Sequence, residues 1–321
     1  MNQRDGFSAV KVLLIEQAMG RSVLRTALAA FEITNIEEWN EVKTDPMDLV
    51  ALAGFDLIIA NIDDGDDAAA ALLRNLRTGA IPGNPFVPAI ITCNSSLAPT
   101  VRAAVDAGAD VVVLKPYSLK QIMDPVAALV DRRRPFIVTS DYVGPERRAA
   151  ARPPAQQGQG ASQGQAIEQI EVPNRLAAKV RGKDPLAEMT AEAEAWAAVE
   201  RQKTQRMVFQ ALFLVRLAAA VSGEETASAA RRDLARLPSV VRELALRLKD
   251  QADYVYLKAF ATWASVYPSL TDAAARRASC DDAATALGAL LKQLGGAEEP
   301  AEAITQADAA VFSYCQRLSA A

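Results

Sequence analysis

Five short apolar stretches in the first third of the chain alternate with segments of helical periodicity. The apolar stretches predict strands at Val10–Ile15, Ile33–Trp39, Phe55–Ile62, Phe86–Thr92 and Asp110–Leu114. The helical spacing predicts helices at Gly20–Phe31, Asp45–Leu52, Ala68–Arg77, Pro99–Ala107 and Leu119–Arg132. Strands that alternate with helices form a parallel sheet with helices on both faces. We therefore predict an α/β domain over residues 8–134 with a doubly wound five-stranded parallel sheet.

The pattern is helical from Asp184 to the end of the chain. It predicts four helices, at Leu186–Val221, Pro238–Tyr267, Leu270–Leu294 and Ala301–Leu318. Four helices with short connections indicate an antiparallel bundle, which we assign to residues 184–321. The long first helix is a candidate for self-association, so we expect a homodimer through this domain.

An aromatic group lies at mixed spacing in the second predicted helix. Its members are Tyr254, Tyr256, Phe260, Trp263 and Tyr267. They favour one of two interpretations: they form the core of the bundle, or they exceed what a core needs and form a partner-binding face.

Residues 135–183 differ in composition and are predicted to be a linker. From Arg132 to Arg152 the chain holds six arginines against Asp141 and Glu146, a net charge of +4, and a Gln/Gly-rich stretch follows. Arg148 and Arg152 fit an R-x-x-x-R pattern that resembles the one PilZ domains use to bind cyclic di-GMP. The rest of that signature is missing, so a solvated basic linker and a contact with an acidic partner surface are the other interpretations.

Composition narrows the class of protein. The chain has 321 residues, 50% of them hydrophobic and 23% charged, with a net charge of −4, which is typical of a globular protein with more than one domain. The net charge does not favour nucleic-acid binding. No apolar run is long enough to span a bilayer or to form a signal peptide, so we expect a cytoplasmic protein without a membrane partner. Three scattered cysteines indicate reduced thiols.

Histidine is absent from the sequence. Its absence excludes Ser-His and Cys-His nucleophilic catalysis, histidine-ligated metals and phosphohistidine transfer. The sequence shows no set of nucleophile, base and orienting group, so we predict that the protein is not an enzyme.

Polar residues stand where the predicted strands end, at the edge where ligands bind in doubly wound sheets. Glu16 and Gln17 follow the first strand, and Lys115-Pro116 follows the last, after a helix that ends in DAGAD (Asp106–Asp110). With these features residues 10–132 resemble the receiver domain of bacterial response regulators, a flavodoxin-like fold. In that family an acidic pair and an aspartate bind Mg²⁺, the aspartate accepts a phosphoryl group, and a hydroxyl residue and the lysine hold it.

The sequence departs from the receiver pattern at most of these positions. One member of the acidic pair is Gln17, and the phosphoacceptor position, five residues after Asp56, holds Asn61. An amide is neither a useful nucleophile nor a charged metal ligand. The hydroxyl position holds Cys93, with Thr92 one place early, and the aromatic switch position holds Val112. We expect no cofactor, and weak Mg²⁺ binding at most.

These departures leave several hypotheses. The first is a non-catalytic adaptor with a degenerate phosphorylation pocket, held in one conformation by an ion pair between Lys115 and Glu16. The second is a response regulator phosphorylated at a displaced aspartate, Asp63 or Asp64. The third is an effector that binds a nucleotide second messenger through the arginine-rich linker.

The resemblance also implies partners and one further property. The expected partners are a histidine kinase or a downstream target of a two-component pathway. Lys115 is the expected neighbour of Cys93 and would lower the pKa of its thiol, which would make the thiol redox-sensitive. The alternative interpretation is that Cys93 is only a small, semi-buried residue.

Overall fold

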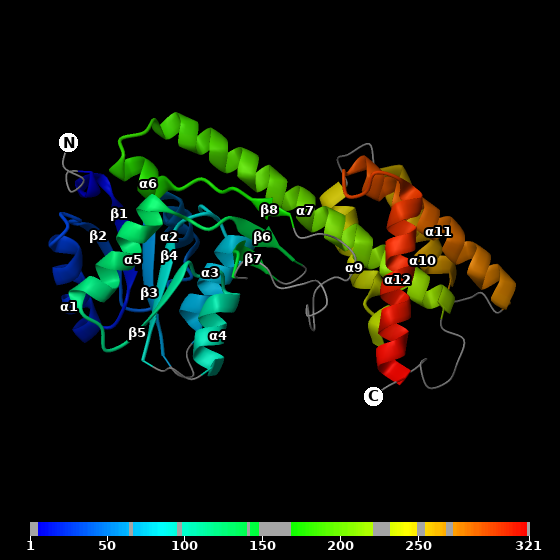
Figure 1. Cartoon of the computed structure of the whole chain (residues 1–321), viewed down its shortest axis with the longest axis horizontal. Helices are drawn as coiled ribbons and strands as arrows, with labels where there is room; N and C mark the ends of the chain where they lie inside the picture. The colour runs from blue at the N-terminus through cyan, green and yellow to red at the C-terminus, as the bar shows by residue number, and fades with distance from the viewer. Residues whose placement is uncertain are drawn as a thin grey trace. The chain divides into compact units, whose positions relative to one another are not determined.

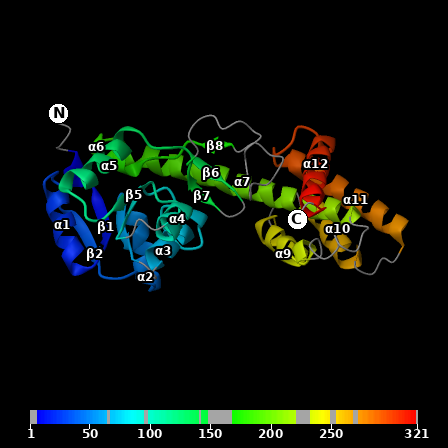
Figure 2. The same cartoon turned by 60° about the horizontal axis from the view of Figure 1, so that its bottom comes forward.

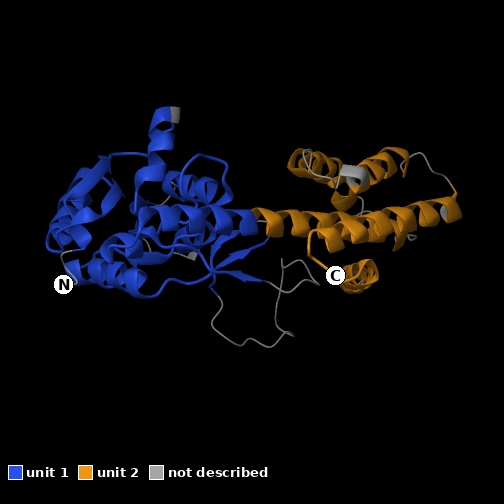
Figure 3. Cartoon of the chain, turned by 90° about the horizontal axis from the view of Figure 1, so that it is seen from above, with its two compact units in different colours: residues 1–151, 168–199 blue, residues 152–167, 200–321 orange. Residues whose placement is uncertain are grey.

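The computed structural model describes residues 6–63, 67–94, 98–139, 142–147, 168–220, 232–248, 254–267 and 272–319. The chain divides into two compact units (Figure 3). Unit 1 comprises residues 1–151 and 168–199, and unit 2 comprises residues 152–167 and 200–321. Helix α7 (Pro185–Ala220) contributes residues to both.

Unit 1 contains a five-stranded parallel sheet (Figure 1). Its strands are β1 (Lys11–Ile15), β2 (Asn35–Trp39), β3 (Leu57–Ile62), β4 (Ala89–Cys93) and β5 (Val111–Leu114). Their order is β2-β1-β3-β4-β5, which is the doubly wound arrangement. The predicted fold class is confirmed, and the winding reverses between β1 and β3, whose carboxyl ends flank the expected crevice.

Helices cover both faces of this sheet (Figure 2). They are η1 (Phe7–Ala9), α1 (Ala18–Ala29), α2 (Pro46–Ala51), η2 (Leu52–Gly54), α3 (Ala68–Thr78), α4 (Ala98–Asp106) and α5 (Leu119–Asp131). α1 and α5 pack on one face, and α3, α4 and η2 on the other. The buried side chains form one cluster on each face of the sheet, and members of the two clusters alternate along the strands.

Local sequence explains several helix ends. The Asp45 side chain accepts from the Met47 N–H at 2.8 Å and begins α2. Ser118 and Gln121 form a capping box at the start of α5. α3 ends at Gly79, whose φ of 73° lies in the left-handed region that favours glycine.

The predicted linker contains ordered structure within unit 1. Strands β6 (Phe136–Val138), β7 (Val143–Pro145) and β8 (Gln169–Ile170) form an antiparallel sheet in the order β7-β6-β8, and α6 (Arg175–Val180) follows. The boundaries predicted at 134 and 184 therefore differ from those of the compact units. The physical reason is burial: Phe136, Val143 and Ile170 pack with Phe86 of the α/β core.

Helix α6 is part of the same core. Leu176, Ala177 and Val180 are buried in the cluster that lies under α1 and α5. The Asn174 side chain accepts from the Ala177 N–H at 3.1 Å and begins the helix. The hydrophobic pattern does not predict this helix, because its six residues are too few to show helical periodicity.

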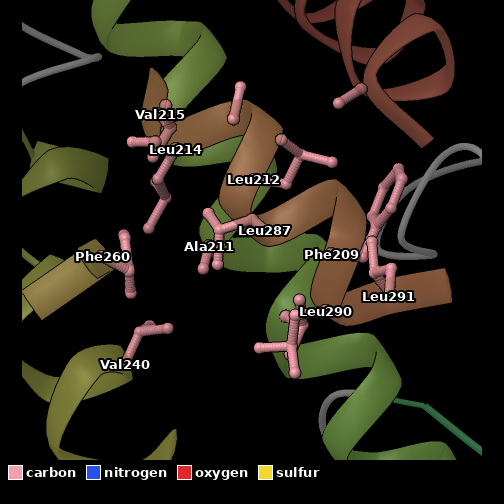
Figure 4. Close-up of a cluster of buried hydrophobic side chains, with 14 of the residues drawn as sticks. Phe209, Ala211, Leu212, Leu214, Val215, Val240, Phe260, Leu287, Leu290 and Leu291 are labelled. Carbon is pink, nitrogen blue, oxygen red and sulfur yellow. The ribbon is translucent and has the colours of Figure 1, made fainter. Parts of the chain in front are cut away.

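Unit 2 is helical, as predicted. Besides the second part of α7, it holds α9 (Leu237–Leu248), α10 (Tyr254–Val266), α11 (Ala273–Gln293) and α12 (Pro300–Ser319). The predicted second helix corresponds to α9 and α10, with residues 249–253 outside the described part of the chain. Side chains from α7, α9, α10 and α11 meet in one buried cluster, which includes Leu212, Phe260 and Leu287 (Figure 4).

The aromatic group contributes to this core. Phe260 and Trp263 are buried, their rings stack at 5.7 Å, and Trp263 contacts the Tyr267 ring at 5.0 Å. Tyr256 and Tyr267 pack partly buried against the same cluster, and the Tyr267 hydroxyl donates to the Ala218 carbonyl at 3.1 Å. Phe260 and Trp263 therefore follow the first interpretation and belong to the core of the bundle, while a partner-binding role for the partly buried Tyr256 and Tyr267 stays a prediction. The Tyr254 side chain lies outside the described residues.

Among the helices that the structure describes, none combines the length and the hydrophobicity needed to cross a bilayer.

Candidate functional site

Four polar side chains extend one face of the sheet beyond the carboxyl ends of its strands. Successive side chains of a strand point to opposite faces, and Leu14, Ile59, Ile90 and Val113 belong to the cluster under α1 and α5. Two residues further along the same strands lie Glu16, Asn61, Thr92 and Lys115. The alternation therefore brings these four side chains to one edge, below α1 and α5.

Glu16 and Lys115 form a largely buried ion pair. Lys115 Nζ lies 2.6 Å from Glu16 Oε2, and the two side chains are 18% and 2% exposed. The other carboxylate oxygen, Oε1, accepts from the Gln17 N–H at 2.9 Å. Both oxygens of Glu16 are thus engaged, and the predicted pairing of Lys115 with Glu16 is present.

Thr92 connects this pair to Asn61. Its hydroxyl lies 3.4 Å from Glu16 Oε2 and 3.3 Å from Asn61 Oδ1, and the residue is fully buried. A hydroxyl has one proton, so it donates to one of these two acceptors at a time. Asn61 and Thr92 are also partners in the β3–β4 register. Among the described residues, Thr92 supplies the aliphatic hydroxyl that contacts Glu16 and Asn61 at the edge.

Cys93 and Val112 belong to the opposite face. Cys93 follows Thr92 in β4, so its side chain points away from Glu16 and Asn61, and it is fully buried. Val112 packs partly buried against the cluster under α3 and α4. The structure gives the hydroxyl position to Thr92 and not to the predicted Cys93, because Thr92 is the register partner of Asn61 and points to the same face of the sheet. The buried Cys93 thiol also lacks the access that a redox-sensitive cysteine needs.

Gly20 lets the Glu16 side chain fold back over the start of α1. A Cβ at position 20 would stand 2.6 Å from Glu16 Cδ and 2.9 Å from Glu16 Oε2. A side chain at position 20 would therefore push the Glu16 side chain out of its present place. No sequence pattern indicates this role, because the contact depends on the turn between β1 and α1.

Tyr117 lies near the pair. Its hydroxyl is buried and has no hydrogen-bond partner among the described residues. Burial raises the pKa of Tyr117 to about 12, and the negative charge of Glu16 acts in the same direction. The phenol therefore stays protonated and neutral beside the ion pair.

Asp63 lies at the end of β3, beyond Asn61. Its Oδ1 accepts from Asn94 Nδ2 at 2.6 Å, which ties the segment after β3 to the segment after β4. Gln17 is exposed. Asp64, Arg148 and Arg152 lie outside the described residues.

Comparisons with known proteins add little to this geometry. No family model matches the chain, and no curated protein matches it either. One similar solved structure is that of a protein described as a CpaE2 pilus assembly protein from Sinorhizobium meliloti 1021. The two are 22% identical over 37% of this chain and 97% of that chain, with a TM-score of 0.27. A score this low supports no argument, so the fold rests on the strand order and register.

The side chains at the edge do not suit Mg²⁺. This ion prefers several hard oxygen ligands, usually including carboxylates, in octahedral geometry. Glu16 already neutralises Lys115, while Gln17 and Asn61 offer only neutral amides. Within the described ranges no group of three or more His, Cys, Asp or Glu side chains is placed to hold a metal ion. Among the described residues of this edge, the Glu16 carboxylate is neutralised by the Lys115 ammonium group and the Asp63 carboxylate is bonded to Asn94, so little net negative charge is left for a divalent cation.

Proposed function

We propose that unit 1 is a degenerate receiver module of a two-component-type signalling protein and that the protein acts as a non-catalytic adaptor. The observation that carries this proposal is the buried ion pair between Lys115 and Glu16 beside Asn61. The strand order, the DAGAD turn and Lys115-Pro116 support the likeness to receivers. Asn61 stands where the family has its phosphoacceptor.

Lys115 differs from the lysine of the family in its partner. In the family the lysine holds the phosphoryl group, so its partner changes when the module is phosphorylated. Here Lys115 has a permanent carboxylate partner in a largely buried site, where breaking the pair would leave an uncompensated buried charge. The pocket is therefore held in one conformation that phosphorylation does not switch, and the module reports the binding of partner proteins instead.

The partners belong to the same proposal. We expect a histidine kinase or a downstream target to bind unit 1, in the cytoplasm, and unit 2 to serve dimerisation or docking. The helical core of unit 2 has no histidine, so it offers no phosphotransfer site of the histidine type.

Mass spectrometry of the intact protein tests the proposal. The full chain is incubated with Mg²⁺ and a small-molecule phosphodonor, and its mass is compared with that of the untreated chain. We expect no phosphoryl adduct. An adduct that disappears on treatment with hydroxylamine, which cleaves acyl phosphates, would contradict the adaptor.

A displaced phosphoacceptor is the second candidate, and one observation favours it. Asp63 stands two residues beyond the acceptor position, at the same edge as Lys115, and its carboxylate accepts a hydrogen bond from Asn94. If Asp63 accepts phosphate, Asp63→Ala abolishes the adduct while Asp131→Ala, an exposed carboxylate at the end of α5, leaves it unchanged. Asp64→Ala tests the neighbouring aspartate in the same way.

Nucleotide binding by Arg148 and Arg152 stays a prediction, to be tested by titration with cyclic dinucleotides.

A further inference from the structure

Strand β5 joins the pocket to a second polar centre at its other end. Lys115 follows the strand, and Asp110 precedes it. The Lys115 N–H donates to the Cys93 carbonyl, and the Asp110 N–H donates to the Ala89 carbonyl, both at 2.8 Å. β5 is thus fastened to β4 at both ends, and a displacement at Lys115 acts on a strand only four residues long.

Asp110, Arg77 and Arg133 form a buried cluster, the Asp110 hub. Their side chains are 2%, 1% and 4% exposed. Asp110 Oδ1 accepts from Arg133 Nε at 2.9 Å, and Oδ2 accepts from Arg77 Nη2 at 3.1 Å and from the Ala89 N–H at 2.9 Å. The hub therefore joins β4 and β5 to α3 and to the end of α5.

The charges of the hub resist rearrangement. Burial by itself would raise the pKa of Asp110, but the ion pairs with Arg133 and Arg77 outweigh it and the pKa is lowered. Burial lowers the pKa of Arg77 to about 10, so this guanidinium also stays charged at neutral pH. Separating charged groups inside a protein is strongly unfavourable, so the hub moves as a unit.

Aromatic contacts lead from the hub to α7. The guanidinium carbons of Arg77 and Arg133 lie 5.2 and 5.0 Å from the centre of the Phe136 ring. Phe136 meets Phe86 at 5.7 Å, and Phe86 meets Trp196 of α7 at 6.3 Å. A Cβ at Gly79 would stand 2.6 Å from the Trp196 ring, so the ring lies directly against the end of α3.

An ion pair and a hydrogen bond also hold the start of α7 against the rest of unit 1. Glu192 accepts from Arg175 Nη2 at 2.6 Å and Nε at 3.0 Å, and from Asn84 Nδ2 at 2.8 Å. The two parallel bonds from Arg175 fix the carboxylate in orientation as well as distance. The start of α7 is therefore held firmly against the rest of unit 1, so a displacement in unit 1 would move it.

We propose that the Asp110 hub couples the Lys115 pocket to helix α7, and that α7 is the output of unit 1. Packed interiors transmit displacement because they have few voids to absorb it. A partner that acts at the pocket shifts β5, the hub shifts with it, and Phe136 and Phe86 pass the change to Trp196. This inference deepens the proposed adaptor and rests on the Lys115–Glu16 pair being the element that partners disturb.

The three tryptophans of the chain provide reporters for a test. The Trp39 carbonyl accepts from the Glu16 N–H at 3.1 Å, Trp196 is the end of the route, and Trp263 lies in the core of unit 2. Indole N–H signals are recorded by nitrogen–proton correlation NMR in the full chain. Lys115→Met removes the cation of the pocket and keeps most of the side-chain volume.

The proposal predicts that Lys115→Met shifts the signals of Trp39 and Trp196. In an Asp110→Asn background the same substitution still shifts Trp39, but its effect on Trp196 falls by about threefold or more, as expected for coupled sites. A purely structural role of Asp110 would move Trp196 without changing how it responds to Lys115→Met. If Asp110→Asn fails to fold, Arg133→Lys replaces it, because lysine keeps the charge and loses the paired N–H geometry.

A matched carboxylate controls for loss of charge. Asp131 is 63% exposed and lies 3.5 Å from Arg181, so Asp131→Asn should leave the response of Trp196 intact. The route is overturned if Trp39 shifts and Trp196 does not, or if the response of Trp196 survives Asp110→Asn and Arg133→Lys. If neither Trp39 nor Trp196 shifts, the ion pair itself does not hold the pocket, and the proposed adaptor fails together with the route.

Discussion

At the scale of single residues, the edge of the sheet is defined by charges and by one missing side chain. Lys115 and Glu16 neutralise each other, Thr92 connects them to Asn61, and Gly20 leaves the space that Glu16 occupies. Only the contact between Gly20 and Glu16 is local in the sequence, and it depends on the turn between them. The other contacts join distant segments. The positions of the side chains at this edge should therefore change when a single carbon atom is added, as at Gly20.

Gly20→Ala should displace the Glu16 carboxylate from Lys115, because the added Cβ would stand 2.6 Å from Glu16 Cδ. Overpacking of this kind typically costs about 1–3 kcal/mol. The free energy of unfolding of unit 1 is measured in urea with the Trp39 indole signal as reporter. Gly54→Ala is the matched control, since its Cβ would meet nothing closer than Lys11 Nζ at 4.0 Å. Equal stability of the two variants would contradict the packing at Gly20.

Two buried aspartates of unit 1 should respond to pH with opposite sign. The pKa of Asp110 is lowered, because the ion pairs with Arg133 and Arg77 outweigh the effect of burial, so its stabilisation is present above the ordinary pKa and is lost as pH falls. The pKa of Asp56 is raised by burial, which outweighs the hydrogen bond from Lys11 and the attraction of Lys179. Ionised Asp56 therefore costs stability as pH rises above its ordinary value of 3.8.

Substitution by asparagine separates the two effects. At neutral pH, Asp110→Asn should lower the free energy of unfolding by about 3 kcal/mol, since two guanidiniums lose their counter-ion. Asp56→Asn should cost far less and should remove the loss of stability on raising the pH from 4 to 7. Urea titrations from about pH 2 to pH 7 measure both, because the stability change linked to Asp110 lies below the ordinary pKa of 3.8 and that linked to Asp56 lies above it. Identical pH profiles for the two variants would refute the assignment.

At the scale of elements, short segments after α5 complete the α/β core. β6, β7 and β8 bury Phe86 of the core, and α6 adds Leu176, Ala177 and Val180 to the cluster under α1 and α5. Lys179 of α6 also lies 3.4 Å from the buried Asp56 carboxylate. These elements are too short to show a pattern, and they are held by burial and not by intrinsic propensity.

Leu176→Ala should destabilise unit 1 by about 2–5 kcal/mol, the usual cost of removing a fully buried leucine side chain. Hydrogen exchange of the α6 amides should accelerate in this variant, because the helix is too short to persist alone. Leu186→Ala is the matched control: Leu186 is 68% exposed, so its loss should change stability by less than about 0.5 kcal/mol. Unchanged exchange in α6 would show that Leu176 does not anchor it.

At the scale of the whole molecule, the division into compact units does not follow the change in sequence pattern. Unit 1 takes in residues 168–199, so the start of the long helix α7 belongs to it. Val199 of that helix is fully buried in a cluster with Phe86 and Phe136. A helical pattern reports periodicity, but the same helix can serve two cores in succession.

A fragment that ends at residue 134 should therefore be less stable than one that ends at residue 199. The shorter fragment exposes Phe86 and the surface under α6, and exposed apolar surface of this kind promotes association. Urea unfolding and sedimentation of the two fragments measure the difference. A fragment 1–134 that is monomeric and as stable as fragment 1–199 would show that the later elements only decorate the core.

Patterns in the amino-acid sequence were enough to establish the class of the fold and the positions at the strand ends. Uninterrupted apolar runs specify buried parallel strands, and the residues that end them, such as Glu16, Asn61 and Lys115, must lie at one edge of the sheet. The helical character of the second half followed from periodicity in the same way. Composition contributed as well, because a chain without histidine cannot carry out several kinds of chemistry in any fold.

Which side chains meet depends on tertiary packing. The choice of Thr92 over Cys93 depends on strand register, and the fit of Gly20 against Glu16 depends on the entry to α1. The Asp110 hub joins residues more than 20 positions apart, as in the pair of Asp110 and Arg133. Periodicity is a local property that fixes which face a residue occupies, whereas contacts between distant segments depend on how those faces pack.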